Sequence, residues 1–164
     1  MFAYFASMDW TPLLATLLGA SIATGSALLV EVRRDRREAA AEWRRSKREL
    51  YGAYLGVLSQ VRSELQLIIL DGEMSEDERR IAARQSFARC YEIRYQLEVF
   101  APRAVVEPAL VYFRSVRRVR EAAVRGVPNG DEGYEAAFRD VIEALTTVRD
   151  AMRLDMNTDR LPAS

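Results

Sequence analysis

The stretch YGAYLGVLSQVRSELQLI, residues 51–68, decides the fold of this chain. Its large apolar residues recur at alternating steps of three and four. This spacing returns them to one side of an α-helix, and a single apolar seam is typical of a helix packed against other helices. The seam consists of Tyr51, Tyr54, Leu58, Val61, Leu65 and Ile68. The stretch therefore predicts an all-α protein.

A second helix is predicted after the turn at Asp71-Gly72. Ser75, with Glu78 three residues later, forms a capping box that starts this helix, and it runs to about Phe100. The apolar contacts expected along it are Ile81, Phe87, Tyr91, Tyr95, Leu97 and Phe100.

Two more helices follow. We expect Pro102 to end the preceding helix and Pro108 to lie in the first turn of the next one. The residues expected to face inward are Leu110, Phe113, Val116 and Ala123, and then Tyr134, Phe138, Val141, Leu145, Val148 and Met152. Arg114, Arg118 and Arg125 are expected to point outward. Short turns between the helices predict an antiparallel four-helix bundle.

Upstream of this bundle, residues 10–30 carry no charge and lie between Asp9 and Glu31. About 20 apolar residues in a helix span the core of a bilayer. Trp10 stands where an aromatic residue meets the membrane interface. We therefore expect an N-terminal transmembrane helix that continues into the bundle, with a buried core helix as the alternative. A cleaved signal peptide is not expected, because no basic residue precedes the run.

Basic residues begin directly after the run. Residues 1–32 hold no Lys or Arg, whereas residues 33–48 hold eight. By the positive-inside rule the N-terminus faces outward and the bundle lies in the cytoplasm. Arg33, Arg34, Arg36 and Arg37 are expected at the lipid headgroups, together with Trp10. We expect Arg34 to pair with Glu38, and Arg45 with Glu49.

The predicted order of segments follows from these patterns. Residues 1–9 form an extracytoplasmic tail, 10–30 the transmembrane helix, and 31–49 a charged helical stalk. Residues 50–157 form the cytoplasmic bundle and 158–164 a flexible tail. Either Met1 or Met8 serves as the natural start.

Small residues within the uncharged run recur every four positions, at Gly19, Ala23 and Ala27. Such a face lets two helix backbones approach closely in lipid, so it is a candidate helix–helix contact in a homo-oligomer. The alternative is a stripe that faces lipid and has no partner.

The residue types restrict the chemistry. The chain has no histidine, which removes the commonest general base and metal ligand. Cys90 is expected to be a buried, inert thiol beside Phe87 and Leu97. The acids of residues 71–78 lack the calcium-loop pattern, and no Gly-rich phosphate loop is present. We predict no catalytic residue, no cofactor and no metal. The net charge of zero and the interleaved acids argue against nucleic-acid binding.

The stretch EWRRSKRELYGAYLGVL, residues 42–58, resembles a loosely defined group of single-pass bacterial membrane proteins. In that group a short N-terminal transmembrane helix runs into a basic stretch and a helical cytoplasmic region. The matching residues are Glu42, Trp43, Arg44, Arg45, Arg48, Tyr51, Tyr54 and Leu55. The terminal stretch, residues 138–156, is similar to the last helix of the group. The resemblance implies a location in the bacterial plasma (inner) membrane. It implies no activity and no site residues.

The leading hypothesis is a membrane-anchored helical interaction or scaffold module, with the lipid bilayer and an unidentified cytoplasmic protein as partners. One alternative is a soluble oligomeric bundle that binds a small ligand between its tyrosine-rich helices. Another is a small membrane effector that oligomerises through Gly19, Ala23 and Ala27.

Overall fold

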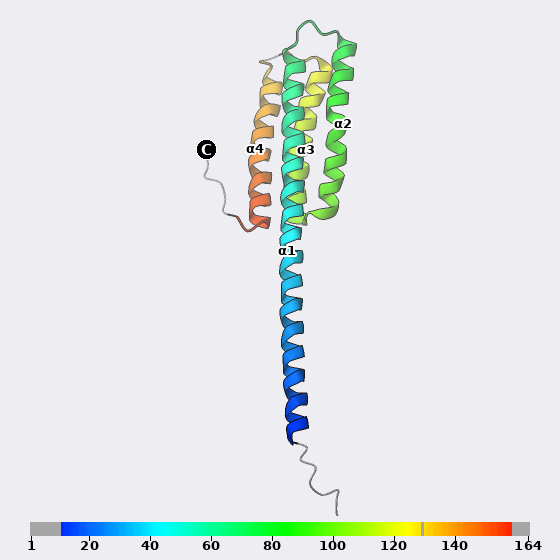
Figure 1. Ribbon diagram of the computed structural model, residues 1–164. Coiled ribbons are helices and arrows are strands. Elements are labelled where there is room, and N and C mark those ends of the chain that lie inside the picture. Colours follow the sequence, from blue (N-terminus) through cyan, green and yellow to red (C-terminus); the bar gives the residue numbers. More distant parts are fainter. Residues whose placement is uncertain (1–10, 129, 159–164) are drawn as a thin grey trace, which may run out of the picture. The chain divides into compact units, whose positions relative to one another are not determined.

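The computed structural model describes residues 11–128 and 130–158, without the side chains of residues 11–30 and 32. Its four helices are α1 (Thr11–Leu70), α2 (Glu76–Phe100), α3 (Arg103–Arg125) and α4 (Glu132–Asp155) (Figure 1). No strand occurs within these residues. The prediction of an all-α protein whose four helices pack against each other is confirmed.

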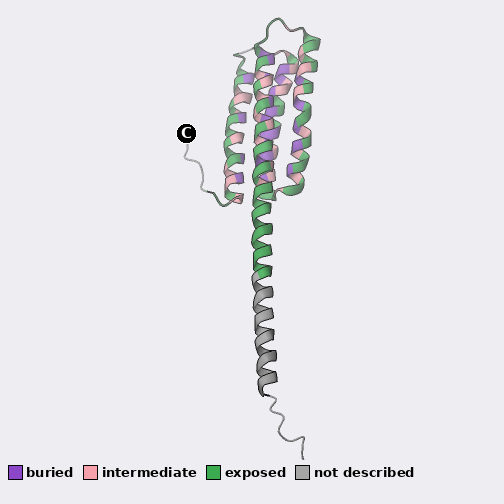
Figure 2. Cartoon of the chain, viewed as in Figure 1, coloured by how far each residue is buried: buried purple, intermediate pink, exposed green. Residues whose placement is uncertain are grey.

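Contacts divide the chain into two compact units, Met1–Trp43 and Arg44–Ser164. In the first unit, the side chains of Glu31 and of residues 33–43 are exposed (Figure 2). Opposite charges one turn apart stabilise this part of α1. The expected pair of Arg34 and Glu38 is present, with Nε and Oε1 2.7 Å apart.

Among the described side chains, no helix combines the length and the apolar character needed to cross a bilayer. Trp10 lies outside the described residues. For residues 11–30 the backbone is helical, but their side chains are not described. The expected span at residues 10–30 stays a prediction.

The second unit owes its core to the seam of residues 51–68. All six predicted seam residues of α1 are buried. The four helices run antiparallel to their neighbours in chain order, and their buried positions face the interior of the bundle (Figures 1 and 2). α1 meets α3 where the Tyr54 hydroxyl donates a hydrogen bond of 2.6 Å to the Ala109 carbonyl. α1 meets α2 through an ion pair between Glu64 and Arg89.

The start of α2 is as predicted, because Ser75 and Glu78 form both hydrogen bonds of the capping box. The expected inward side is wrong in part. Ile81, Tyr95 and Phe100 are more than half exposed, whereas the buried seam of α2 is Ala83, Phe87, Cys90, Ile93 and Leu97.

The physical reason is that α3 fixes which side of α2 is covered. The Phe113 ring of α3 packs against both Phe87 and Tyr91, with centroid separations of 5.2 and 5.5 Å. Tyr95 instead contacts the Arg94 guanidinium, 5.0 Å from its ring centroid, and remains largely in water.

The start of α3 also differs from the prediction. Pro102 is the N-cap and Arg103 the first residue, so Pro108 lies inside the helix rather than in its first turn. A proline removes a single backbone N–H from the helix. Burial of Val105 in the turn before Pro108 and of Ala109 just after it stabilises the extra turn.

The last helix follows its predicted seam. Tyr134, Val141, Val148 and Met152 are buried, and Phe138 and Leu145 are half-buried. Asp131 caps α4 by accepting hydrogen bonds from the backbone N–H groups of Gly133 and Tyr134. The preceding turn uses Gly126 with φ +67°, a left-handed conformation that suits glycine.

Candidate functional site

A groove of about 290 Å³ lies between α3 and α4 on the outside of the bundle. Its lining combines small or apolar side chains with opposite charges. The α3 residues are Pro108, Val111, Ser115 and Arg118, and the α4 residues are Asp140, Glu143, Ala144 and Thr147. A surface of this composition suits the binding of a partner by packing and charge together.

Ser115 and Arg118 both line the groove and are joined by a hydrogen bond. Ser115 is buried, and its hydroxyl donates to the Val111 carbonyl at 3.1 Å. Arg118 Nη2 donates to that same hydroxyl at 3.1 Å and lies 3.0 Å from Asp140 Oδ2. The guanidinium is therefore fixed between the two helices. The Ser115 hydroxyl thus donates to a backbone carbonyl and accepts from the guanidinium that it helps to position.

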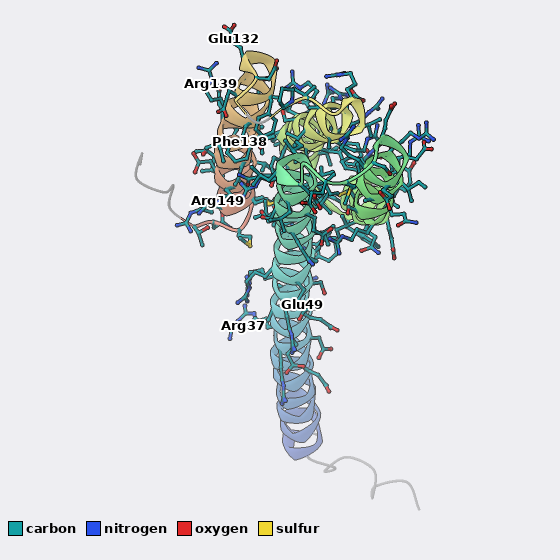
Figure 3. All side chains as sticks on the ribbon, turned by 90° about the horizontal axis from the view of Figure 1, so that it is seen from above. Arg37, Glu49, Glu132, Phe138, Arg139 and Arg149 are labelled. Carbon is teal, nitrogen blue, oxygen red and sulfur yellow. The ribbon has the colours of Figure 1, made fainter. Side chains whose placement is uncertain are left out.

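The two walls of the groove differ in charge. α3 contains six arginines and two glutamates, whereas α4 contains six acids and three arginines. A second hollow of about 390 Å³ lies along α3 and is lined by Val111, Arg114, Arg117, Arg118 and Glu121, so three of its five lining residues are arginines. On α4, Glu132 projects away from the other helices (Figure 3). The groove thus separates a basic surface from an acidic one.

The structure places the predicted interface arginines on α1. Arg33, Arg34, Arg36 and Arg37 are all exposed. Figure 3 shows Arg37 projecting from α1 into solvent. Gly19, Ala23 and Ala27 lie in the helical part of α1 whose side chains are not described, so the proposed helix–helix contact remains a prediction.

Cys90 is fully buried, as the sequence predicts. Burial raises the pKa of its thiol to about 12, and the nearby charge of Arg89 opposes this increase without overcoming it. A protonated thiol is a poor nucleophile and metal ligand. In the part of the chain that the structure describes, no three His, Cys, Asp or Glu side chains converge to bind a metal ion.

Two of the tyrosines that suggested a ligand pocket, Tyr54 and Tyr112, are fully buried in the core. The rings of Tyr54 and Tyr112 meet edge to face, with centroids 6.4 Å apart. Burial raises the pKa of both phenols. Ser59 and the Tyr112 hydroxyl lie within hydrogen-bond distance, at 3.4 Å. These two side chains pack between α1 and α3, and the alternative of a small ligand bound between the helices stays a hypothesis.

Sequence reasoning found the outward arginines of α3 but missed the groove. The outward positions of Arg114, Arg118 and Arg125 are confirmed. The available signal was the contrast between the arginine-rich α3 and the acid-rich α4. That contrast identifies a site only when the two helices are known to be neighbours.

Comparison with known proteins gives no relative: no family model, no curated protein and no solved structure matches the chain.

Proposed function

We propose that this chain is a membrane-anchored helical interaction module that acts by binding a partner and not by catalysis. The observation that carries the proposal is the abrupt change at residue 30. Twenty-one uncharged residues precede it, and a helix with exposed side chains, rich in arginine, follows it. An uncharged run of this length fits the bilayer core, and arginines favour the cytoplasmic, anionic side.

The bundle supplies the binding part of the module. Residues from Arg44 onward form a compact unit with its own apolar core, and its surface carries the groove between α3 and α4. We assign the unidentified cytoplasmic partner to this surface. The bundle then lies in the cytoplasm, with the N-terminus outside the bacterial plasma membrane.

The anchor is tested by alkaline carbonate extraction of membranes from cells that express the full chain. We expect the protein to resist extraction. Ile22→Arg places a charge in the middle of the uncharged run, which costs about 2.5–3.5 kcal/mol at the centre of a membrane helix. This variant should move to the soluble fraction, whereas the control Ile81→Arg, at an exposed bundle position, should not. If carbonate releases the unmodified chain into the soluble fraction, the anchor is refuted and the soluble bundle is favoured.

The orientation is tested with an impermeant maleimide. In a Cys90→Ala background, Gly72→Cys introduces one exposed thiol in the turn between α1 and α2. We expect no labelling in intact cells and full labelling after permeabilisation. Labelling of intact cells would place the bundle outside and overturn the proposed topology.

A further inference from the structure

The opposite walls of the α3–α4 groove continue as rows of exposed charges. Among the described residues, the side chains of Arg114 on α3 and Glu143 on α4 are exposed and have no hydrogen-bond or ion-pair partner. Arg118 and Asp140, one turn away along the two helices, are paired across the groove. A free positive charge on α3 and a free negative charge on α4 therefore lie next to the fixed pair, both on the same side of it.

The pair of Arg118 and Asp140 sets the relative height of the two helices. Because α3 and α4 run antiparallel with the same rise per residue, residues before 118 lie level with residues after 140 (Figure 1). Arg114 is then level with Ala144, the neighbour of Glu143. In the other direction, Arg125 is level with Gly133, the neighbour of Glu132. At each of three heights, α3 presents an arginine and α4 an acid.

This pattern is complementary to itself under one kind of two-fold rotation. With the axis parallel to the helices, α3 of one copy faces α4 of the other at equal height, so each arginine meets an acid. With the axis across the helices, α3 faces α3, and arginines meet arginines. Like charges across an interface cost several kcal/mol, so charge selects the parallel axis.

The same face also offers apolar surface. Val111 in the groove is 50% exposed, and so is Leu154, three helical turns beyond Glu143 on the same side of α4. Apolar side chains at the centre of an interface supply most of its packing, while charges set partner choice and register.

We infer that the partner of this groove is a second copy of the chain, which docks through a two-fold axis parallel to the bundle. Arg114 then contacts Glu143 of the partner subunit, and the symmetric contact forms as well. The inference rests on the proposed interaction module, whose partner it names, but not on its anchor. A parallel axis also brings both copies of Arg44 to the same end of the dimer, which suits two chains held in one membrane.

Sedimentation of the detergent-solubilised full chain tests this dimer. Arg114→Glu or Glu143→Arg alone should weaken dimerisation by about tenfold or more, because each places like charges together twice. Arg114→Glu combined with Glu143→Arg should restore it. The control is the same exchange on α2, Arg84→Glu with Glu92→Arg, two exposed residues without an ion-pair partner among those described, which should leave the dimer unchanged.

Several outcomes would overturn the inference: a monomeric parent chain, single variants that dimerise normally, or a double variant that is not restored. A dimer that withstands charge reversal and is lost in Gly19→Leu/Ala23→Leu would also overturn it, since the uncharged run would then be the contact. Circular dichroism of each variant confirms folding. Carbonate extraction reports the anchor separately, so failure of the anchor and failure of the dimer are distinguishable.

The axis is tested by spin labels on Gly72→Cys in the Cys90→Ala background. Parallel bundles place the two labels at the same end of the dimer. Antiparallel bundles separate them by about 35 Å or more, the length of a helix of some 25 residues at 1.5 Å per residue. A long separation would refute the parallel axis.

Discussion

Lys47 and Asp155 lie 108 positions apart in the sequence, yet Lys47 Nζ is 2.7 Å from Asp155 Oδ2. The Tyr51 hydroxyl donates to the same oxygen at 2.7 Å. Both charged side chains are only 17% exposed. One carboxylate oxygen therefore joins the beginning of the bundle in α1 to its end in α4.

Asp155→Ala should destabilise the bundle, because it leaves the partly buried ammonium of Lys47 and the phenol of Tyr51 without their shared acceptor. Hydrogen bonds to charged groups contribute about 1.5–3 kcal/mol, so we expect a loss of about 2 kcal/mol in the free energy of unfolding. Urea denaturation of the full chain measures it. Glu107→Ala, which breaks the exposed pair with Arg103, should cost about 0.5 kcal/mol or less. Equal losses in the two variants would contradict the structural role of Asp155.

Phe87 and Phe100 on α2 should respond differently to truncation. Phe87 is fully buried against Tyr91 and Phe113, whereas Phe100 is 54% exposed. Phe87→Ala should lower the free energy of unfolding by about 3–5 kcal/mol, as expected for an aromatic residue removed from a core. Phe100→Ala should cost less than about 1 kcal/mol. If both variants lost similar stability, the side of α2 that faces the core would be wrongly assigned.

Replacing two glycines by alanine should change the free energy of unfolding in opposite directions. Gly126 has φ +67°, and a Cβ there would lie 2.8 Å from Arg79 Cζ, so Gly126→Ala should destabilise by about 1–2 kcal/mol. Gly52 is helical and exposed, with no atom near the position of an added Cβ. Gly52→Ala should stabilise by about 0.5–1 kcal/mol, because glycine is unfavourable inside a helix. Thermal unfolding compares the two, and a stabilising Gly126→Ala would exclude the left-handed turn.

The free energy of unfolding should fall at alkaline pH, and the Cys90 thiol should be the first group to contribute to this fall. The pKa of its thiol is raised from 9.0 to about 12 by burial, so the folded chain keeps the proton that the unfolded chain releases above pH 9. The stabilisation is complete below pH 9 and is lost as pH rises towards 12, by about 1.4 kcal/mol per pH unit. Cys90→Ala should remove the decline between pH 9 and 10 in denaturant unfolding. If the stability of that variant declines as much as that of the parent chain, another group causes the decline.

Above pH 10 the buried tyrosines should add to this decline. Burial raises the pKa of Tyr54 and, together with the hydrogen bond to Asp155, that of Tyr51. Their phenols stay protonated in the folded chain while those of the unfolded chain ionise, so stability falls as pH rises. Denaturant unfolding of Tyr54→Phe measures the contribution of Tyr54 to this loss of stability, because the variant lacks the titrating hydroxyl and keeps the ring.

The sequence by itself determined the helical class, the seam of α1, the seam of α4 and the capping box at Ser75. These features depend on neighbours three or four residues away in the same helix, so the pattern of the chain contains all the information they need. The same reasoning identified Arg114, Arg118 and Arg125 as outward residues and Cys90 as buried.

Only the tertiary structure decided which side of α2 faces the core, where α3 begins and which charges meet. Ala83 and Ile93 are buried on α2 in place of the expected Ile81 and Tyr95, because Phe113 of α3 packs against the side of α2 that carries Phe87. The pairs of Lys47 with Asp155 and of Arg118 with Asp140 arise in the same way. A contact between helices depends on their relative height and rotation, which packing of the whole core fixes.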